Sequence, residues 1–331
     1  MAFETVTQQG VAAFALGQLL SESLELSDAI AATNKTWQAL RTATKENLVK
    51  LGWLDNSTAT AAVDHVSNLI SVIAVPEHLN TAPEMERFYS YLPEFTQPFL
   101  QSWLSAIKRW SDTYKRLLKE DPSVAVHRED IPLVMTDVNA YYSAIYHLMV
   151  IPPAIMMPPF VATKVPEFVN YGAIGKILGH ELTHSFDPKF STMSRTGDVV
   201  NWYTNRSWLN FEKRVNCVIK QLSDSTNSPT HALEAFSEAF ADTAGMEKAH
   251  LAYQTLPDKQ GFLGYSREQL FFVAGCFVFC SSQPYRSEGI YPAYALRCNL
   301  PASNDKHFAQ VFKCAPGSWF NPQNRCTFHE T

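Results

Sequence analysis

The chain has 331 residues, of which 46% are hydrophobic and 18% charged, the proportions of a globular protein with a sizeable core. Its formal net charge of −5 argues against nucleic acid as a partner, because phosphate binding requires a basic surface. No apolar run is long enough to span a membrane, and the apolar residues 10–20 follow Glu4 without a Lys or Arg, which is a poor signal peptide. We expect no membrane segment here and, for an exported protein, a targeting segment outside this chain.

Residues 11 to about 120 are predicted to be helical. A first helix begins at Ser27, and a second opens at Asp55 and keeps helical apolar spacing as far as Ile73. A third is predicted over about 97–119, with large apolar residues on one face and basic residues elsewhere. We interpret that helix as packed on one face and solvated on the other, rather than as membrane-bound.

The middle of the chain has a different sequence pattern from the helical region before it. Short strands are predicted over 134–142 and 148–151, and a cluster of prolines then excludes a long helix before about Asn170. Further helices are predicted over 205–222, 231–254 and 266–280. The tail after Pro284 is expected to be rich in loops.

The most informative motif is His180-Glu181-Leu182-Thr183-His184. On a helix, residues four apart lie on one face, so both imidazoles can bind the same zinc ion. Glu181 points in another direction and is placed to act on a water instead of the ion. The pattern is therefore typical of a zinc metallopeptidase, and the alternative is a helix with two unrelated histidines.

Glycines at 172, 175 and 179 precede the first histidine at helical spacing. Because glycine has no Cβ, this stripe predicts that another element approaches the helix closely.

A catalytic zinc site needs a third protein ligand. About fifty residues later, an apolar helix carries Glu234, Glu238 and Asp242 at intervals of four residues. Buried acids need a partner such as a metal ion. In one register Glu238 is the ligand and Asp242 bonds a ligating histidine; in another, Glu234 is the ligand with Glu238 behind it. The spacing alone does not choose between them.

Two compositional signals indicate an oxidising compartment, and so an extracellular or cell-surface protein. All six cysteines lie after residue 216, at positions 217, 276, 280, 298, 314 and 326. Three glycosylation sequons begin at Asn34, Asn56 and Asn205.

Together, the two metal-site motifs resemble those of the neprilysin-like gluzincins. Gly245 follows Asp242 at that family's spacing. Other matching segments are Gly52-Trp53-Leu54-Asp55, Asn139-Ala140-Tyr141-Tyr142, Pro158-Pro159-Phe160, Asn170-Tyr171-Gly172, Gly197-Asp198 with Trp202, Gln269-Leu270-Phe271-Phe272, and the pair Cys314 and Cys326. The resemblance covers nearly all of this chain but only about the C-terminal half of a typical member.

The resemblance implies a mainly α-helical catalytic domain of gluzincin type with a small β-sheet. It implies one zinc ion per chain, held by His180, His184 and Glu238. Asp242 then orients a ligating histidine, and Glu181 activates the attacking water. In this scheme residues 1–125 belong to a helical, substrate-enclosing lobe, and residues 126–331 form the zinc-binding catalytic region.

The resemblance also assigns substrate contacts. Asn139 and Ala140 lie on the strand that pairs with a peptide substrate, and Arg297 matches an arginine that binds a substrate carbonyl or carboxylate. Where the family has a histidine six residues before this arginine, the chain has Tyr291. We expect its hydroxyl to lie near the oxyanion that develops during hydrolysis, with less stabilising power than an imidazolium.

Family analogy pairs Cys217 with Cys326 and leaves Cys280 and Cys314 for partners in an N-terminal half outside this chain. Cys276 and Cys298 are additional, and we expect them to pair with each other. The family's terminal Cys-x-x-Trp is replaced by Cys326-Thr-Phe-His and two further residues.

The sequence therefore predicts a zinc endopeptidase that cleaves small extracellular peptides and needs an N-terminal half. The alternative is a catalytically weak or inactive homologue that binds peptides or partners, which the replacement by Tyr291 favours. Retention of Glu181 argues against that alternative, because a binding module has no chemical need for it.

Overall fold

In a computed structural model, the described residues are 12–94, 98–117, 133–187, 201–257 and 260–329. They form two compact units that interleave along the sequence. The first comprises Met1–Ile30, Ile70–Tyr141 and Leu148–Ile155; the second comprises Ala31–Leu69, Tyr142–His147 and Met156–Thr331. The division at residue 125 into a substrate-enclosing lobe and a catalytic region stays a prediction. Among the described residues, no helix combines the length and apolar character needed to cross a membrane.

The first unit contains the strands β1 and β3 and several helices. These are α2 (Ala13–Ser23), β1 (Ile70–Ile73), η1 (Glu77–Leu79), α5 (Ala82–Phe88), η2 (Tyr89–Tyr91), α6 (Phe99–Leu117), β3 (Leu148–Ile151) and η4 (Pro153–Ile155). The sheet has the order β1-β3-β2, where β2 is Tyr141–Ser143. β1 and β3 are parallel, with Ile70 opposite Leu148 and Ile73 opposite Ile151.

Two predictions about these strands are wrong. The second predicted helix, α4, ends at Asn68 rather than Ile73, because residues 70–73 pair with the distant strand β3 instead of continuing the helix. The strand predicted over 134–142 is limited to Tyr141–Ser143, and the described residues before it form bends and irregular chain.

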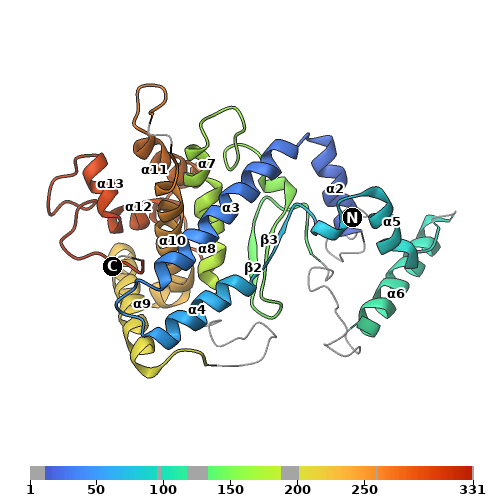
Figure 1. The fold of residues 1–331 in the computed structure, drawn as a ribbon, viewed down its shortest axis with the longest axis horizontal. Coiled ribbons are helices and arrows are strands. Elements are labelled where there is room, and N and C mark those ends of the chain that lie inside the picture. The colour runs from blue at the N-terminus through green and yellow to red at the C-terminus, as the bar shows by residue number, and fades with distance from the viewer. Residues whose placement is uncertain (1–11, 95–97, 118–132, 188–200, 258–259, 330–331) are drawn as a thin grey trace. The chain divides into compact units, whose positions relative to one another are not determined.

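The second unit is a set of packed helices (Figure 1). They are α4 (Asn56–Asn68), α7 (Phe168–Gly172), α8 (Ile174–His184), α9 (Asn205–Thr226), α10 (Pro229–Gln254), α11 (Arg267–Phe277), α12 (Tyr294–Asn304) and α13 (Lys306–Val311), together with most of α3 (Ser27–Leu48). The helices predicted to begin at Ser27 and Asp55 and near 205, 231 and 266 are confirmed. The tail after Pro284 is rich in loops as predicted, but it also contains two short helices, α12 and α13, with Pro301 inside α12.

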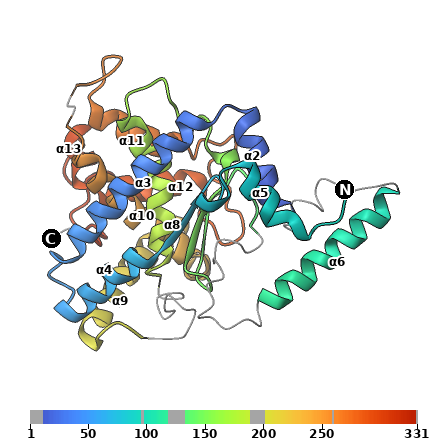
Figure 2. The same ribbon diagram turned by 45° about the vertical axis from the view of Figure 1, so that its right-hand side comes forward.

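The contact that builds the site is between α8 and α10, which lie side by side in both views (Figures 1 and 2). A Cβ added at Gly179 would lie 2.3 Å from the carbonyl oxygen of Gly245, and one at Gly245 would lie 2.6 Å from the amide nitrogen of His180. Only glycine permits this approach, so the predicted close contact of the glycine stripe is confirmed here. The crossing sets His180 directly against α10.

Segments of the second unit that lie far apart in the sequence are joined by polar contacts and a disulfide. Asp55 caps α4 through the amide of Thr58 and accepts a hydrogen bond from Ser207 on α9. The predicted Cys217–Cys326 disulfide is present, with Cα atoms 5.6 Å apart, and joins α9 to the C-terminal tail. These links join α9 to the start of α4 and to the C-terminal tail.

Candidate metal centre

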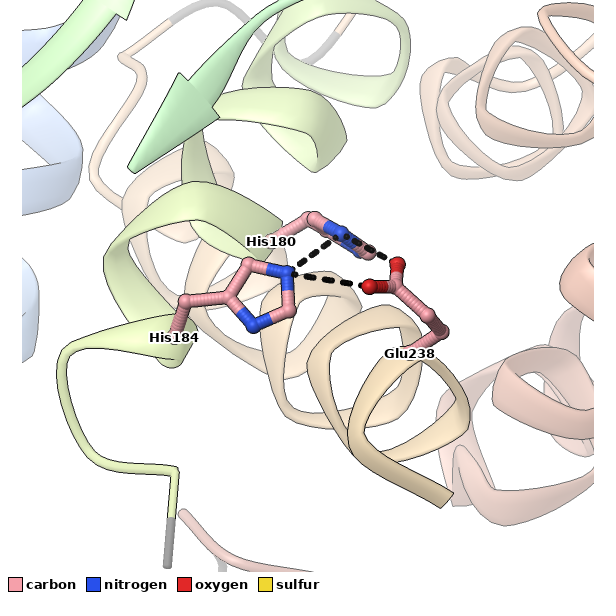
Figure 3. Close-up of side chains that lie close together, drawn as sticks. All are labelled: His180, His184 and Glu238. Carbon is pink, nitrogen blue, oxygen red and sulfur yellow. Dashed lines mark hydrogen bonds and ion pairs between the residues drawn. The ribbon is translucent and has the colours of Figure 1, made fainter. Parts of the chain in front are cut away.

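Three side chains from α8 and α10 converge on one point (Figure 3). His180 and His184 come from successive turns of α8, and Glu238 faces them from α10. The Nε2 atoms of the two imidazoles are 3.0 Å apart. Glu238 places Oε2 3.2 Å from Nε2 of His180 and Oε1 3.7 Å from Nε2 of His184.

These separations fit a zinc ion. A tetrahedral zinc with bonds of about 2.0–2.1 Å holds its ligand atoms roughly 3.3 Å apart. Glu238 Oε2 is buried and has no hydrogen-bond partner among the described residues. The Nε2 atoms of both imidazoles also face this carboxylate, so a cation at this point would have two nitrogen ligands and one oxygen ligand. The donor set of two nitrogens and a carboxylate is one that catalytic zinc sites use.

The two acids that the spacing left undecided have different environments. Glu238 is buried within the cluster, whereas Glu234, one turn earlier on α10, is exposed. The structure therefore places Glu238, and not Glu234, beside the two histidines. The Gly179–Gly245 contact explains the choice, because it fixes which turn of α10 faces α8.

His180 is oriented by a buried carboxylate. Its Nδ1 lies 2.9 Å from Oδ1 of Asp242, which leaves Nε2 to face the cluster. Burial favours the neutral imidazole, but the hydrogen bond to Asp242 and the nearby Glu238 carboxylate outweigh it and raise the pKa of His180 to about 9. Although burial opposes ionisation, Arg297 and His180 hold the pKa of the Asp242 carboxyl well below its usual range. The surroundings thus favour positive charge at this point.

Arg297 holds Asp242 from the other side. Its Nε donates to Oδ2 at 2.7 Å and its NH2 group to Oδ1 at 3.0 Å, the bidentate geometry that guanidinium groups favour. The guanidinium lies over the ring of Phe279 at 4.5 Å and the ring of Tyr291 at 4.9 Å. Tyr291 is 37% exposed. The structure therefore brings Tyr291 and Arg297 to the Asp242 side of the cluster.

Glu181 lies at the edge of the cluster. Its Oε1 is 4.0 Å from Nε2 of His180, and its side chain is buried. At that distance Glu181 is not placed to bind the same ion as His180. Its carboxylate is, however, within reach of a water at the cluster.

The second histidine is less firmly held. Nδ1 of His184 is buried without a hydrogen-bond partner among the described residues, and its nearest carboxylate oxygen, Oδ2 of Asp187, is 3.8 Å away. Asp187 itself accepts a hydrogen bond from Ser237, which precedes Glu238 on α10. The backbone after His184 is held separately, because the carbonyl of Ser185 is 3.0 Å from Nε2 of His65.

The predicted substrate-contact residues Asn139 and Ala140 belong to the first unit, where Asn139 is exposed and Ala140 is buried. Their role stays a prediction. Gly197 and Asp198, which contribute to the family resemblance, lie outside the described residues.

The sequence reasoning missed four residues near the cluster: Asp187, which lies 3.8 Å from His184 and accepts a hydrogen bond from Ser237, and Phe279 and Lys176, which contact Arg297. Lys176 is fully buried one turn before His180 and donates to two backbone carbonyls. A lysine among the apolar residues of a predicted buried helix was a signal available in the sequence.

The fold and the cluster together define a gluzincin-type metallopeptidase domain, mainly α-helical with a small sheet. The model of Peptidase family M13 matches residues 139–328, more than half of the chain, which therefore belongs to this family.

Individual relatives agree with this assignment. Human endothelin-converting enzyme 1 is 28% identical over 328 residues, covering 95% of this chain and 42% of the relative. Neprilysin-3 of Drosophila melanogaster is 27% identical over 332 residues, covering 96% and 42%. The chain thus spans about two fifths of the length of these relatives.

Solved structures show the same fold. PepO from Lactobacillus rhamnosis has a TM-score of 0.76 at 21% identity, covering 96% of this chain and 50% of that one. The zinc metalloprotease ZMP1 of Mycobacterium tuberculosis, in complex with an inhibitor, has a TM-score of 0.73 at 22% identity, covering 96% and 49%.

Proposed function

We propose that this chain is the catalytic half of a zinc endopeptidase that hydrolyses peptide bonds in small extracellular peptides. The observation that carries the proposal is the convergence of His180, His184 and Glu238, with Nδ1 of His180 bonded to Asp242. A bound zinc ion would polarise the scissile carbonyl and lower the pKa of an attacking water. A buried carboxylate beside such a cluster, as Glu181 is, provides the general base.

The chain's own residues have distinct proposed roles. Glu181 takes the proton from the attacking water and passes it to the leaving amine. Asp242 keeps Nδ1 of His180 protonated and its ring oriented. Arg297 uses two donor groups on Asp242 and retains others for a substrate carbonyl or carboxylate. Asn139 and Ala140 pair with the substrate backbone by strand addition.

We assign Tyr291 to the oxyanion. Its ring lies against Arg297 and it is partly exposed, so a substrate bound by Arg297 comes close to the phenol. A neutral phenol donates a hydrogen bond but brings no positive charge, so it stabilises the oxyanion less than an imidazolium.

The proposed setting is the cell surface or the extracellular space, with the remaining half of the protein supplied by a segment outside this chain. The Cys217–Cys326 and Cys276–Cys298 disulfides are consistent with an oxidising compartment. Cys280 and Cys314 are unpaired within the described residues, and we propose that they pair with that other half.

The test combines metal analysis with peptide cleavage by the protein carrying its N-terminal half. We expect one zinc per chain, cleavage of short peptides, and loss of cleavage with a chelator. Glu181→Gln removes the base while keeping the shape of the side chain, so the rate should fall by about 10²–10⁴-fold with zinc retained. Glu234→Gln, on the exposed acid one turn before Glu238, is the matched control and should cleave normally. A Glu181→Gln variant as fast as the wild type would refute the mechanism.

A wild-type protein that binds zinc and peptides without cleaving them would support the binding-module alternative instead. In that case peptide affinity should be the same for wild type and Glu181→Gln.

A further inference from the structure

Lys176 lies on α8 one turn before His180 and is completely buried. Its ammonium donates to the carbonyl of Arg297 at 2.7 Å and to the carbonyl of Gly275 at 3.3 Å. It also lies 4.3 Å from the centre of the Phe279 ring, within the range of a cation–π contact. One side chain of α8 therefore binds both α11 and α12.

The two carbonyls that Lys176 binds belong to the residues just before two bonded cysteines. Cys276 follows Gly275 on α11, Cys298 follows Arg297 on α12, and their disulfide brings the Cα atoms to 4.8 Å. The ammonium and the disulfide thus fix the same two points of backbone. We call Lys176 and the Cys276–Cys298 disulfide the brace.

The brace acts on the residue that holds the metal-site carboxylate. Arg297, whose carbonyl accepts from Lys176, donates two hydrogen bonds from its guanidinium to Asp242. Asp242 in turn bonds Nδ1 of His180. Phe279 lies beside both cations, at 4.3 Å from the Lys176 ammonium and 4.5 Å from the Arg297 guanidinium. A continuous series of contacts therefore runs from Lys176 to the first histidine.

A buried lysine is costly. Desolvation lowers the pKa of Lys176 to about 7, even though the nearby Asp242 opposes this shift. An apolar side chain of similar volume would fill the same space without that cost. Packing alone therefore does not explain why a lysine occupies position 176.

We propose that Lys176 is a positioning residue that, with the Cys276–Cys298 disulfide, fixes Arg297 so that its guanidinium keeps Asp242, and hence His180, in the metal-binding orientation. This inference rests on the proposed zinc site. The disulfide acts from α11 and α12 and the ammonium from α8, so the brace stabilises the Asp242 side of the site from outside it.

The test is a double-mutant cycle read out as zinc affinity, by competition with a chromophoric chelator. Lys176→Met keeps the volume and removes the donor. Loss of a residue that bonds a metal ligand weakens affinity about 10–100-fold, and Lys176 acts two contacts further away, so we expect roughly a three- to tenfold loss. In an Arg297→Ala background the same change should have no further effect, because the group through which Lys176 acts is gone.

The matched control is Lys248→Met. Lys248 is also fully buried, on α10, but it donates to Oγ1 of Thr183 rather than to Arg297. Its replacement should cost similar stability, and any effect on zinc affinity should be the same with and without Arg297. The visible spectrum of the Co²⁺-substituted protein gives a second readout, which Lys176→Met should change in the wild-type background only.

Cys276→Ser with Cys298→Ser is the second variant, for use if Lys176→Met does not fold. It should also lower zinc affinity only while Arg297 is present. Unchanged affinity, or an equal loss in the Arg297→Ala background, would overturn the brace while leaving the zinc site intact. Absence of zinc from the wild type would instead refute the proposed function, and the brace with it.

Discussion

The two histidines of the cluster come from adjacent turns of one helix, yet their surroundings differ. Nδ1 of His180 is bonded to Asp242, and the bidentate Arg297 holds Asp242 in place. Nδ1 of His184 has no hydrogen-bond partner among the described residues, and the nearest carboxylate oxygen, on Asp187, is 3.8 Å away.

The difference shows that the fold prepares the two ligands to different extents. The buried Asp242 carboxylate orients the ring of His180 without an ion. Nδ1 of His184 lacks such an acceptor among the described residues, so we expect binding of the ion itself to contribute more to the orientation of this ring. We therefore expect the Asp242 side to contribute most of the preorganisation of the site.

Replacement of Asp242 by Ala should show the largest loss of this preorganisation. Zinc affinity should fall about 10–100-fold, because His180 loses its orienting acceptor and Arg297 is left buried without its partner. Competition with a chromophoric chelator measures the loss. Asp242→Asn, which keeps an acceptor oxygen for Nδ1, should lose less. Equal affinities for the Ala variant and the wild type would contradict the comparison.

Changes at Tyr291 should separate catalysis from metal binding on the same side of the site. Loss of one oxyanion donor costs about 10²–10³-fold in rate, and a neutral phenol supplies part of that. We expect Tyr291→Phe to lower kcat several-fold and Tyr291→His to raise it, while KM and zinc affinity change little. Steady-state kinetics with one peptide substrate provide the measurement. If both variants match the wild type, Tyr291 has no catalytic role.

The smallest effect is expected on the other side, at Asp187. Because its carboxylate is 3.8 Å from His184, Asp187→Ala should weaken zinc binding by less than about threefold. The same chelator competition tests this, with Asp242→Ala measured in parallel. A loss as large as that of Asp242→Ala would show that His184 is held as firmly as His180, and the comparison would fail.

Parts of this site were predictable because they depend on local geometry. Residues four apart on a helix share a face wherever the helix lies, so His180 and His184 could be paired from sequence. The choice between Glu234 and Glu238 could not be made from spacing, since both lie on one face of α10. The contact of Gly179 with Gly245 decides it, and that contact is tertiary.

Other features could not be predicted from the sequence, for related reasons. The strand β1 was taken for the end of a helix because its apolar residues also fit helical spacing, and its pairing with β3 is non-local. The helix α12 was missed because Pro301 lies inside it. The lysine at position 176 stands out in the sequence as a charged residue in an apolar helix, but its partners are not predictable, because they are backbone carbonyls, which every residue has.

The central claim is that one zinc ion is bound by His180, His184 and Glu238. Anomalous diffraction at the zinc edge, from crystals of protein supplied with zinc, tests it most directly. We predict one strong peak per chain, about 2.0–2.2 Å from Nε2 of each histidine and from a carboxylate oxygen of Glu238. A peak elsewhere, no peak, or coordination that omits Glu238 would contradict the account.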